Sequence, residues 1–301
     1  MDLTIVSRSG RKIAQVSLPD EAKLRDLKDA FHKTNTKYYP DRQRFTLPTT
    51  SASEKPLSVL EDIPLKEQLS DATVVFKDLG PQISWRSVFV IEYLGPLLIF
   101  PIFLMRPWFI YGTDLPPLIE QQYSGFVAFL FHYVKRELET LLVHKFSNST
   151  MPIMNVFKNS IYYWGFAAGI GYFLFHPLYT PVAMGRYAFC MAMFWFWEVA
   201  NFVTHAYLSS LRPAGTRVRK IPRDGAFEFV SCPNYLFEIL AWMSFNLFTS
   251  TLVGWAFFVA GSAQMLVWAM KKHKNYQKEF DGKDGRELYP KGRKALIPFI
   301  L

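Results

Sequence analysis

Cysteine is scarce in this sequence, and so are the short motifs that mark common cofactor sites. The 301 residues include only two cysteines, Cys190 and Cys232, and both lie within or beside apolar segments. They give neither a disulfide framework nor the paired spacing of a metal site. No CxxC pair, HExxH helix, P-loop or GxGxxG turn after a strand occurs. The sequence therefore predicts no metal, and any bound nucleotide would be held by a helical bundle.

Acidic residues are also under-represented. The chain has 25 Asp and Glu against 34 Lys and Arg, which gives a net charge of +9. The basic residues lie at the ends of apolar segments, so nucleic acid is not the expected partner. The positive-inside bias of membrane proteins explains most of the excess. A ligand that carries phosphate groups would explain the rest, particularly beside the basic segment RVRKIPR at 217–223.

Long apolar runs dominate the chain after residue 84. Half of all residues are hydrophobic and 17% are aromatic. The runs have about the 20-residue length that crosses a hydrocarbon core. The pattern predicts an α-helical polytopic membrane protein with about six transmembrane helices, at 83–105, 123–146, 161–178, 187–208, 235–248 and 252–270. Lys and Arg are dense in alternate connections, and this density predicts that both termini are cytoplasmic.

Residues 1–78 read instead as a soluble domain, with 79–301 embedded in the membrane. The amino terminus is polar and alternating, so no signal peptide is expected. Ser9-Gly10 marks a hairpin, Pro19-Asp20 starts a helix with Leu24, Leu27 and Phe31 on one face, and the segments RFTL and ATVVFKDLG are short strands separated by PTTSASEKP. This order is similar to a ubiquitin-like β-grasp domain.

Several polar residues interrupt the predicted spans. Glu92 lies in the first span, and the second contains HYVKRELETLLVHK, in which His132, Arg136 and Glu139 share a helical face, as do Tyr133 and Glu137. Ionisable groups in a membrane are costly and usually face a bundle interior or a water-filled cavity. A salt-bridged helix at the cytoplasmic interface explains Lys135, Glu137 and Glu139 equally well.

Two further spans carry polar stripes. Glu198, Asn201 and His205 fall on one face of the fourth span, and Asn234, Tyr235 and Glu238 open the fifth. Asn and neutral His both donate and accept hydrogen bonds, so the first stripe suits a nicotinamide or ribose. No third ligand is spaced to make a metal site there. Beyond the sixth span come Lys271, Lys272, His273 and Tyr276, which, taken alone, are better explained by interfacial anchoring.

Five sequence blocks resemble the steroid 5-alpha-reductase family, and within it the very-long-chain trans-2,3-enoyl-CoA reductases of the endoplasmic reticulum. The blocks are GPQISWRSVFVIEYLGPLL, FHYVKRELETLLVHKFSNSTMP, NSIYYWGF, IPRDGAFEFVSCPNYLFE and the terminal KALIPFIL. Their order and spacing cover essentially the whole chain. The resemblance implies an NADPH-dependent reductase of fatty acid elongation, acting on trans-2,3-enoyl-CoA beside the other elongation enzymes, with an N-terminal ubiquitin-like domain that the steroid reductases lack.

The resemblance also implies roles for individual residues. It makes Tyr235 the proton donor and Glu92 with Tyr133 the pair that holds the substrate carbonyl oxygen, with an exchange of the two tyrosines' roles as the alternative. The cofactor would be lined by Arg136, Asn201, His205, Arg212, Lys220, Asn234, Glu238, Lys272, His273 and Tyr276. Lys220 stands where the steroid enzymes carry arginine, and His205 replaces a family aspartate. For the phosphates of coenzyme A the chain offers Lys135, Lys145 and Lys158 on the cytoplasmic side.

Two other functions remain open at this point. One is a related reductase of a sterol or polyprenal enone, and the other is a non-catalytic membrane adaptor that docks through residues 1–78. The basic cytoplasmic loops and Tyr235 argue against the former. The buried polar stripes argue against the latter, because an adaptor gains nothing from burying Glu92, Asn201 and Glu238.

Overall fold

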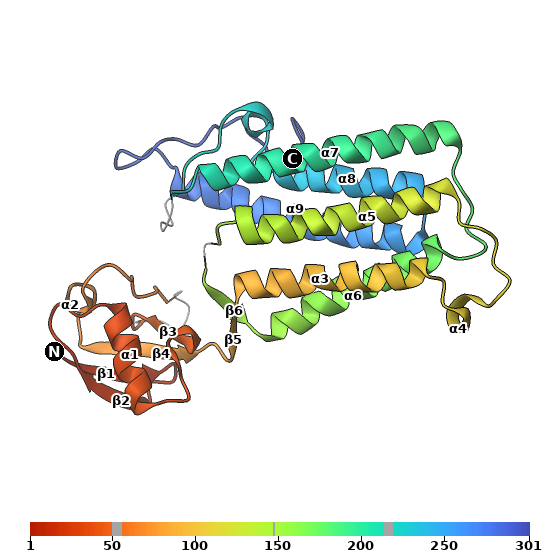
Figure 1. The fold of residues 1–301 in the computed structure, drawn as a ribbon. Helices are drawn as coiled ribbons and strands as arrows, with labels where there is room; N and C mark the ends of the chain where they lie inside the picture. The colour runs from red at the N-terminus through yellow and green to blue at the C-terminus, as the bar shows by residue number, and fades with distance from the viewer. Residues whose placement is uncertain (50–55, 147, 214–218) are drawn as a thin grey trace. The chain divides into compact units, whose positions relative to one another are not determined.

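The computed structural model of the chain describes residues 1–49, 56–146, 148–213 and 219–301. Its residue contacts divide it into two compact units. One unit comprises Met1–Trp85 together with Asn148–Asn155, and the other contains most of the remaining chain. The first unit holds a small sheet and the second a set of long helices (Figure 1). A small mixed domain followed by a helical region is thus confirmed. Most of the expected loop PTTSASEKP lies outside the described residues.

The first unit is built on a four-stranded mixed sheet. The strands lie in the order β2-β1-β4-β3 and comprise β1 (Asp2–Ser7), β2 (Lys12–Ser17), β3 (Gln43–Thr46) and β4 (Thr73–Asp78). β1 runs parallel to β4, and the other two pairs are antiparallel. The expected hairpin joins β1 to β2, and Gly10 there has a φ of 80°, which glycine adopts without a side-chain clash.

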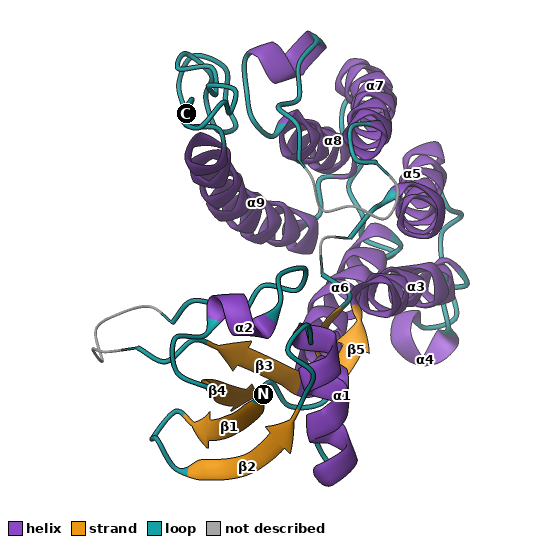
Figure 2. Ribbon diagram, turned by 90° about the vertical axis from the view of Figure 1, so that its left-hand side faces the viewer, coloured by secondary structure: helices purple, strands orange, loops and turns teal. Residues whose placement is uncertain are grey.

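Helix α1 (Leu24–Thr34) provides the other half of this unit's core (Figure 2). Leu24, Leu27 and Phe31 are buried, as their spacing predicts. The helix begins later than Pro19-Asp20 because its start is fixed at Lys23, whose backbone N–H donates to the Asp26 carboxylate at 2.8 Å. The hydrogen bond that satisfies the Lys23 N–H therefore decides where this helix starts.

A bidentate ion pair closes the end of β4. Arg42 donates from Nε and Nη2 to the two carboxylate oxygens of Asp78, at 2.6 and 2.7 Å. The hydrogen-bonded guanidinium lowers the pKa of the Asp78 carboxyl below its usual range. The unit is completed by the 3-10 turn Pro40–Arg42, helix α2 (Leu65–Gln68) and the antiparallel pair β5 (Gln82–Ser84) and β6 (Thr150–Pro152).

The second unit contains six long helices among the described residues. They are α3 (Trp85–Leu104), α5 (Glu120–Leu138), α6 (Met154–Leu174), α7 (Met184–Ser210), α8 (Pro233–Thr249) and α9 (Leu252–Glu279). A single turn, α4 (Trp108–Tyr111), follows α3, a π-helical turn (Glu139–Val143) continues α5, and the 3-10 turn Gly225–Glu228 precedes α8. Each predicted span coincides with one long helix. α9 continues to Glu279 beyond the apolar run, because its lysine-rich end favours a helix without being apolar.

Two of these helices, α3 and α9, are long and apolar enough to cross a membrane by length and composition. The polar side chains of α5 interrupt its apolar run, although the helix lies beside the others in the bundle (Figures 1 and 2). Large apolar side chains are exposed on several helices, including Leu98, Ile161, Phe189 and Val259. Outward-facing apolar surface of this kind is typical of contact with lipid.

Aromatic residues fill the interior of the bundle. Phe100 and Phe129 stack with ring centroids 3.9 Å apart, and Phe245 packs on Phe129 and Trp242. This aromatic core lies next to the polar residues of α5, α7 and α8. Tyr133 of α5 and Trp242 of α8 belong to the core itself. The site described below is therefore held by large, closely packed side chains.

Candidate active site within the helical bundle

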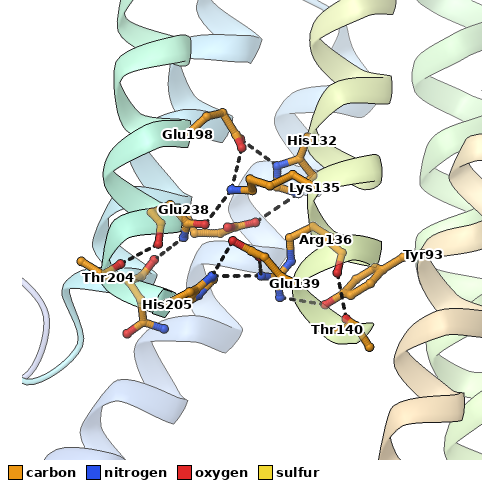
Figure 3. A network of polar contacts seen from close by, with 12 residues as sticks. Tyr93, His132, Lys135, Arg136, Glu139, Thr140, Glu198, Thr204, His205 and Glu238 are labelled. Carbon is orange, nitrogen blue, oxygen red and sulfur yellow. Dashed lines mark hydrogen bonds and ion pairs between the residues drawn. The ribbon is translucent and has the colours of Figure 1, made fainter. Parts of the chain in front are cut away.

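Arg136 is the centre of a buried polar network. Its Nη1 lies 2.6 Å from Glu139 Oε2 and 3.3 Å from His205 Nδ1, and its Nη2 donates to the Tyr93 hydroxyl at 3.0 Å. The guanidinium also lies over the Tyr93 ring, 5.2 Å from its centroid. These partners come from α3, α5, α7 and the π-helical turn, so one side chain connects distant parts of the chain (Figure 3).

A second cluster surrounds Glu198 on α7. His132 Nδ1 lies 2.7 Å from Glu198 Oε1, and Lys135 Nζ lies 2.6 Å from Glu198 Oε2. His132 Nε2 also lies 3.3 Å from Glu238 Oε1 on α8, and Lys135 donates to Asn201 Oδ1 at 2.7 Å. The Glu198 and Asn201 side chains are about 1% exposed. Removing a charge such as that of Glu198 from water costs several kcal/mol, and only close pairing with an opposite charge offsets that cost.

The predicted stripe on α7 does face the interior. Figure 3 shows Glu198 and His205 on the side of α7 that faces α5. Asn201 lies between them and donates to the backbone carbonyl of Asn234 at 2.9 Å. Pro233 opens α8 at its first position, where the missing N–H costs nothing, and thereby fixes where Asn234 and Glu238 project. The bundle therefore brings together Arg136, Asn201, His205, Asn234 and Glu238.

Glu92 and Tyr133 are neighbours of Tyr93, which is a member of the Arg136 network. Asn159 Nδ2 of α6 donates to Glu92 Oε2 at 2.8 Å. Tyr133 is 2% exposed and packs on Tyr93, with ring centroids 6.1 Å apart. The structure thus groups Glu92 and Tyr133 beside the Arg136 network.

Tyr235 lies at the start of α8, next to α9. Lys272 Nζ lies 5.7 Å from the centroid of its ring, and the Trp268 ring centroid is 6.3 Å away. Tyr235 and Lys272 are therefore neighbours.

The remaining predicted residues lie nearer the ends of the helices. Arg212 Nη1 donates to the Lys145 carbonyl at 2.5 Å, and Lys145 Nζ donates to the carbonyls of Ser209 and Arg212 at 2.9 and 2.7 Å. Lys158 and Lys220 are exposed. Lys135 instead lies inside the network, 8% exposed and paired with Glu198, rather than on a surface that could meet coenzyme A.

His273 and Tyr276 contact the carboxyl-terminal segment that follows α9. His273 Nδ1 lies 2.6 Å from Ser231 Oγ, which lies 2.7 Å from the Tyr289 hydroxyl. Tyr276 stacks on Tyr289 with ring centroids 5.4 Å apart. Arg293 in the same segment donates to the Pro222 carbonyl at 2.8 Å. These contacts hold the segment against the ends of α8 and α9.

Sequence reasoning did not assign a site role to four members of the network, Tyr93, His132, Glu139 and Asn159. The shared helical face of His132, Arg136 and Glu139 was the signal that could have found two of them. Tyr93 follows Glu92 directly, but a single tyrosine in an aromatic-rich span carries no signal of its own. Asn159 could not be found because its role depends on α6 packing against α3.

Four carboxylate or amide oxygens in or beside the network are buried without a hydrogen-bond partner among the described residues. Glu139 Oε1 and Glu198 Oε2 face ion-pair partners, and the other two are Asn234 Oδ1 and Glu137 Oε1. A buried acceptor without a donor costs about 1–3 kcal/mol, so such atoms suggest a ligand that donates to them. The amide of a nicotinamide ring and the hydroxyls of a ribose are donors of this kind. The residues present therefore fit a nicotinamide cofactor.

Comparison with known proteins identifies relatives over the whole chain. Residues 149–301 match the family described as 3-oxo-5-alpha-steroid 4-dehydrogenase. A Dictyostelium discoideum protein named very-long-chain enoyl-CoA reductase is 44% identical over 306 residues, covering all of both chains. A human protein named trans-2,3-enoyl-CoA reductase-like is 35% identical over 288 residues, covering 92% of this chain and 77% of its own length.

Proposed function

This chain belongs to the very-long-chain enoyl-CoA reductases of the steroid 5-alpha-reductase family, and we propose that it reduces trans-2,3-enoyl-CoA to saturated acyl-CoA with NADPH. The reaction would be the last step of a cycle that elongates very-long-chain fatty acids. The observation that carries this proposal is the full-length identity to an enoyl-CoA reductase. The buried polar network supports it, because a scaffold protein has no use for so many desolvated charges.

The cofactor would be held by the network between α5, α7 and α8. NADPH, when bound, supplies a hydride, and the protein supplies position and electrostatics. Asn234 Oδ1 and the Glu238 carboxylate suit the nicotinamide amide, while Asn201 and His205 suit a ribose. Arg136, Arg212, Lys220, Lys272 and His273 suit the phosphates, and Tyr276 would line the same region. Lys220 would contact phosphate as a point charge rather than bidentately.

Glu92 and Tyr133 would polarise the thioester carbonyl. Negative charge develops on its oxygen as hydride arrives at C3, and preoriented hydrogen-bond donors stabilise that charge. Asn159 holds the Glu92 carboxyl in place through its 2.8 Å hydrogen bond. In this role Glu92 is protonated and donates, together with the Tyr133 hydroxyl, to the substrate oxygen.

Tyr235 would deliver the proton to C2. Its hydroxyl is the donor in this assignment, and Lys272 lies over the same ring, 5.7 Å from its centroid. Solvent reprotonates the hydroxyl after product leaves. The C2 proton and the C3 hydride then account for the two hydrogens that the double bond gains.

Coenzyme A would stay at the cytoplasmic surface, where Lys145 and Lys158 are exposed and basic. Lys135 does not contact coenzyme A in this proposal, because it is already paired with Glu198 inside the bundle. The acyl chain would lie among the aromatic residues of the spans.

The membrane setting is part of the same proposal. All six long helices would span the endoplasmic reticulum membrane, with both termini in the cytoplasm, in a bundle of the steroid 5-alpha-reductase type. Residues 1–78 would form a cytoplasmic ubiquitin-like β-grasp domain, which the order β2-β1-β4-β3 with one packed helix supports. The elongase, ketoacyl reductase and dehydratase of the elongation cycle would be the enzyme's partners.

A steroid or polyprenal enone is the second candidate substrate. The match of residues 149–301 to the steroid dehydrogenase family favours it. Both substrates present a double bond conjugated to a carbonyl, so the same polarising pair would serve either one. They differ in the polyanionic head group, which only the thioester carries.

The test is reduction by the purified full-length protein in detergent, followed as loss of the reduced-nicotinamide absorbance. We expect turnover with NADPH and a long-chain trans-2-enoyl-CoA, and none with a steroid or polyprenal enone. Turnover of the enones alone would favour the second candidate. No oxidation of NADPH or NADH with any of these substrates would contradict the proposal.

A further inference from the structure

The end of α5 brings two histidines and a glutamate together. One ligand atom from each of Glu139, His144 and His205 lies within 4.8 Å of the others. Glu139 begins the π-helical turn and His144 follows it directly, while His205 comes from α7. The sequence offered no third ligand beside His205, because Glu139 and His144 lie far away along the chain. Only the packing of α5 on α7 reveals the set.

The two oxygens of Glu139 have different surroundings. Oε2 receives the ion pair from Arg136 at 2.6 Å. Oε1 is buried and lies 3.1 Å from His205 Nδ1 without the geometry of a hydrogen bond. Oε1 therefore faces the histidines with a lone pair to offer, whereas the charge on Oε2 is paired with Arg136. A carboxylate divided in this way suits a metal on one oxygen and a supporting donor on the other.

The spacing of the three ligand atoms suits zinc. Zn–N and Zn–O bonds of roughly 2.0–2.2 Å in a tetrahedron place neighbouring ligand atoms about 3.3 Å apart. The 3.1 Å between Glu139 Oε1 and His205 Nδ1 already matches that value. The rings of His144 and His205 have centroids 5.0 Å apart, and all three ligand atoms lie within 4.8 Å of one another, so the three side chains can supply three of the four positions.

The local backbone and the exposure of His144 support access to such a site. π-helical turns are rare and occur frequently at functional sites. The turn at Glu139–Val143 ends with His144, whose backbone N–H donates to the Glu139 carbonyl at 2.7 Å. His144 is half-buried, whereas Glu139 is 1% exposed. An ion would therefore enter past His144, with water as its fourth ligand.

We propose that Glu139, His144 and His205 form a Zn²⁺ site whose occupancy opposes binding at the Arg136 network. The Arg136 guanidinium lies 3.3 Å from His205 Nδ1 and shares the Glu139 carboxylate, so a divalent cation there repels it. Zn²⁺ would thus draw Glu139 and His205 away from Arg136. An anion that needs Arg136 would bind more weakly to the zinc-loaded protein, and zinc would bind more weakly to the anion-loaded one.

The experiment measures metal binding directly, so it stands whether or not the chain is a reductase. The full-length protein in detergent, stripped with a chelator, is titrated with Zn²⁺ against a chromogenic zinc indicator. We expect one equivalent to bind, and Co²⁺ to give the absorption of a four-coordinate nitrogen and oxygen site. His144→Ala should weaken Zn²⁺ binding by more than tenfold, since even outer-sphere partners contribute about 10–100-fold.

His176→Ala is the matched control, because His176 is also half-buried but lies outside the cluster. It should bind Zn²⁺ as the unaltered chain does. Adding NADPH should weaken Zn²⁺ binding to the unaltered chain. Equal Zn²⁺ affinity in the unaltered chain and His144→Ala, equal weakening by the two substitutions, or no Zn²⁺ bound at all would overturn the metal site. The opposition rests on the proposed function, so NADPH binding is followed in the same sample by nicotinamide fluorescence. Zn²⁺ affinity unchanged while NADPH is bound would overturn the proposed opposition.

Discussion

Lys135 Nζ lies 2.6 Å from Glu198 Oε2, and both side chains are buried in the bundle at 8% and 1% exposure. A lysine in the sequence HYVKRE looks like a surface residue on an interfacial helix. The structure makes it a neutralising partner inside the protein instead. The pair joins α5 to α7, and it holds Asn201 through the 2.7 Å hydrogen bond from Lys135.

Breaking this pair should destabilise the protein. Lys135→Met keeps the aliphatic stem but removes the charge, and it leaves Glu198 with His132 as its remaining ion-pair partner. Removing one partner of a buried pair costs about 3–5 kcal/mol. The expected result is a lower midpoint of thermal unfolding in detergent. Lys158→Met, at an exposed position, should leave the midpoint unchanged, and an equal midpoint for Lys135→Met would show that the pair contributes no stability.

Glu92→Gln should reduce turnover less than Glu92→Ala. Glutamine still accepts from Asn159 and still donates to a substrate oxygen, whereas alanine leaves a cavity and an amide without its acceptor. The measurement is kcat for enoyl-CoA reduction in both variants. Normal rates in both would make Glu92 a structural residue only.

Tyr235→Phe should nearly abolish turnover while NADPH binding persists. The substitution removes only the phenolic proton, and general acid catalysis contributes about 10²–10⁴-fold. Cofactor binding is checked separately by nicotinamide fluorescence. Tyr123→Phe, at an exposed tyrosine, is the control. Near-normal kcat in Tyr235→Phe would remove this residue from the mechanism and leave Tyr133 as the alternative donor.

Asn148 should carry no glycan, although Asn148-Ser149-Thr150 is an acceptor sequence. The loop that contains it is basic and therefore expected on the cytoplasmic side, away from the glycosylation machinery. The check is the mass of the protein from cells before and after endoglycosidase. A mass shift that Asn148→Gln abolishes would place this loop in the lumen and would contradict the cytoplasmic placement of Lys145 and Lys158.

The sequence predicted the division into a small sheet domain and a helical region because hydropathy and turn signals are local. Leu24, Leu27 and Phe31 form a buried stripe at the predicted spacing, and the Ser9-Gly10 hairpin is confirmed. The start of α1 and the end of α9 were predicted less well. Capping by Asp26 and the charged end of α9 act independently of hydropathy.

The sequence could predict only those parts of the site whose residues lie on one helix. The stripe Glu198, Asn201 and His205 needs one helix, and the structure turns it inward as expected. The pairing of Lys135 with Glu198 and of Glu92 with Asn159 joins different helices, and no local pattern encodes which helices meet. For the same reason the cluster of Glu139, His144 and His205 became visible only in three dimensions.

The position of two hydrogens in the product tests the central claim most directly. The purified protein reduces a long-chain trans-2-enoyl-CoA with NADPH deuterated at the transferable position of its nicotinamide, and in a parallel reaction with unlabelled NADPH in heavy water. Mass spectrometry then locates the label in the saturated acyl chain. The account predicts cofactor deuterium at C3 only and solvent deuterium at C2 only. Cofactor label at C2, or a product without cofactor label, would contradict it.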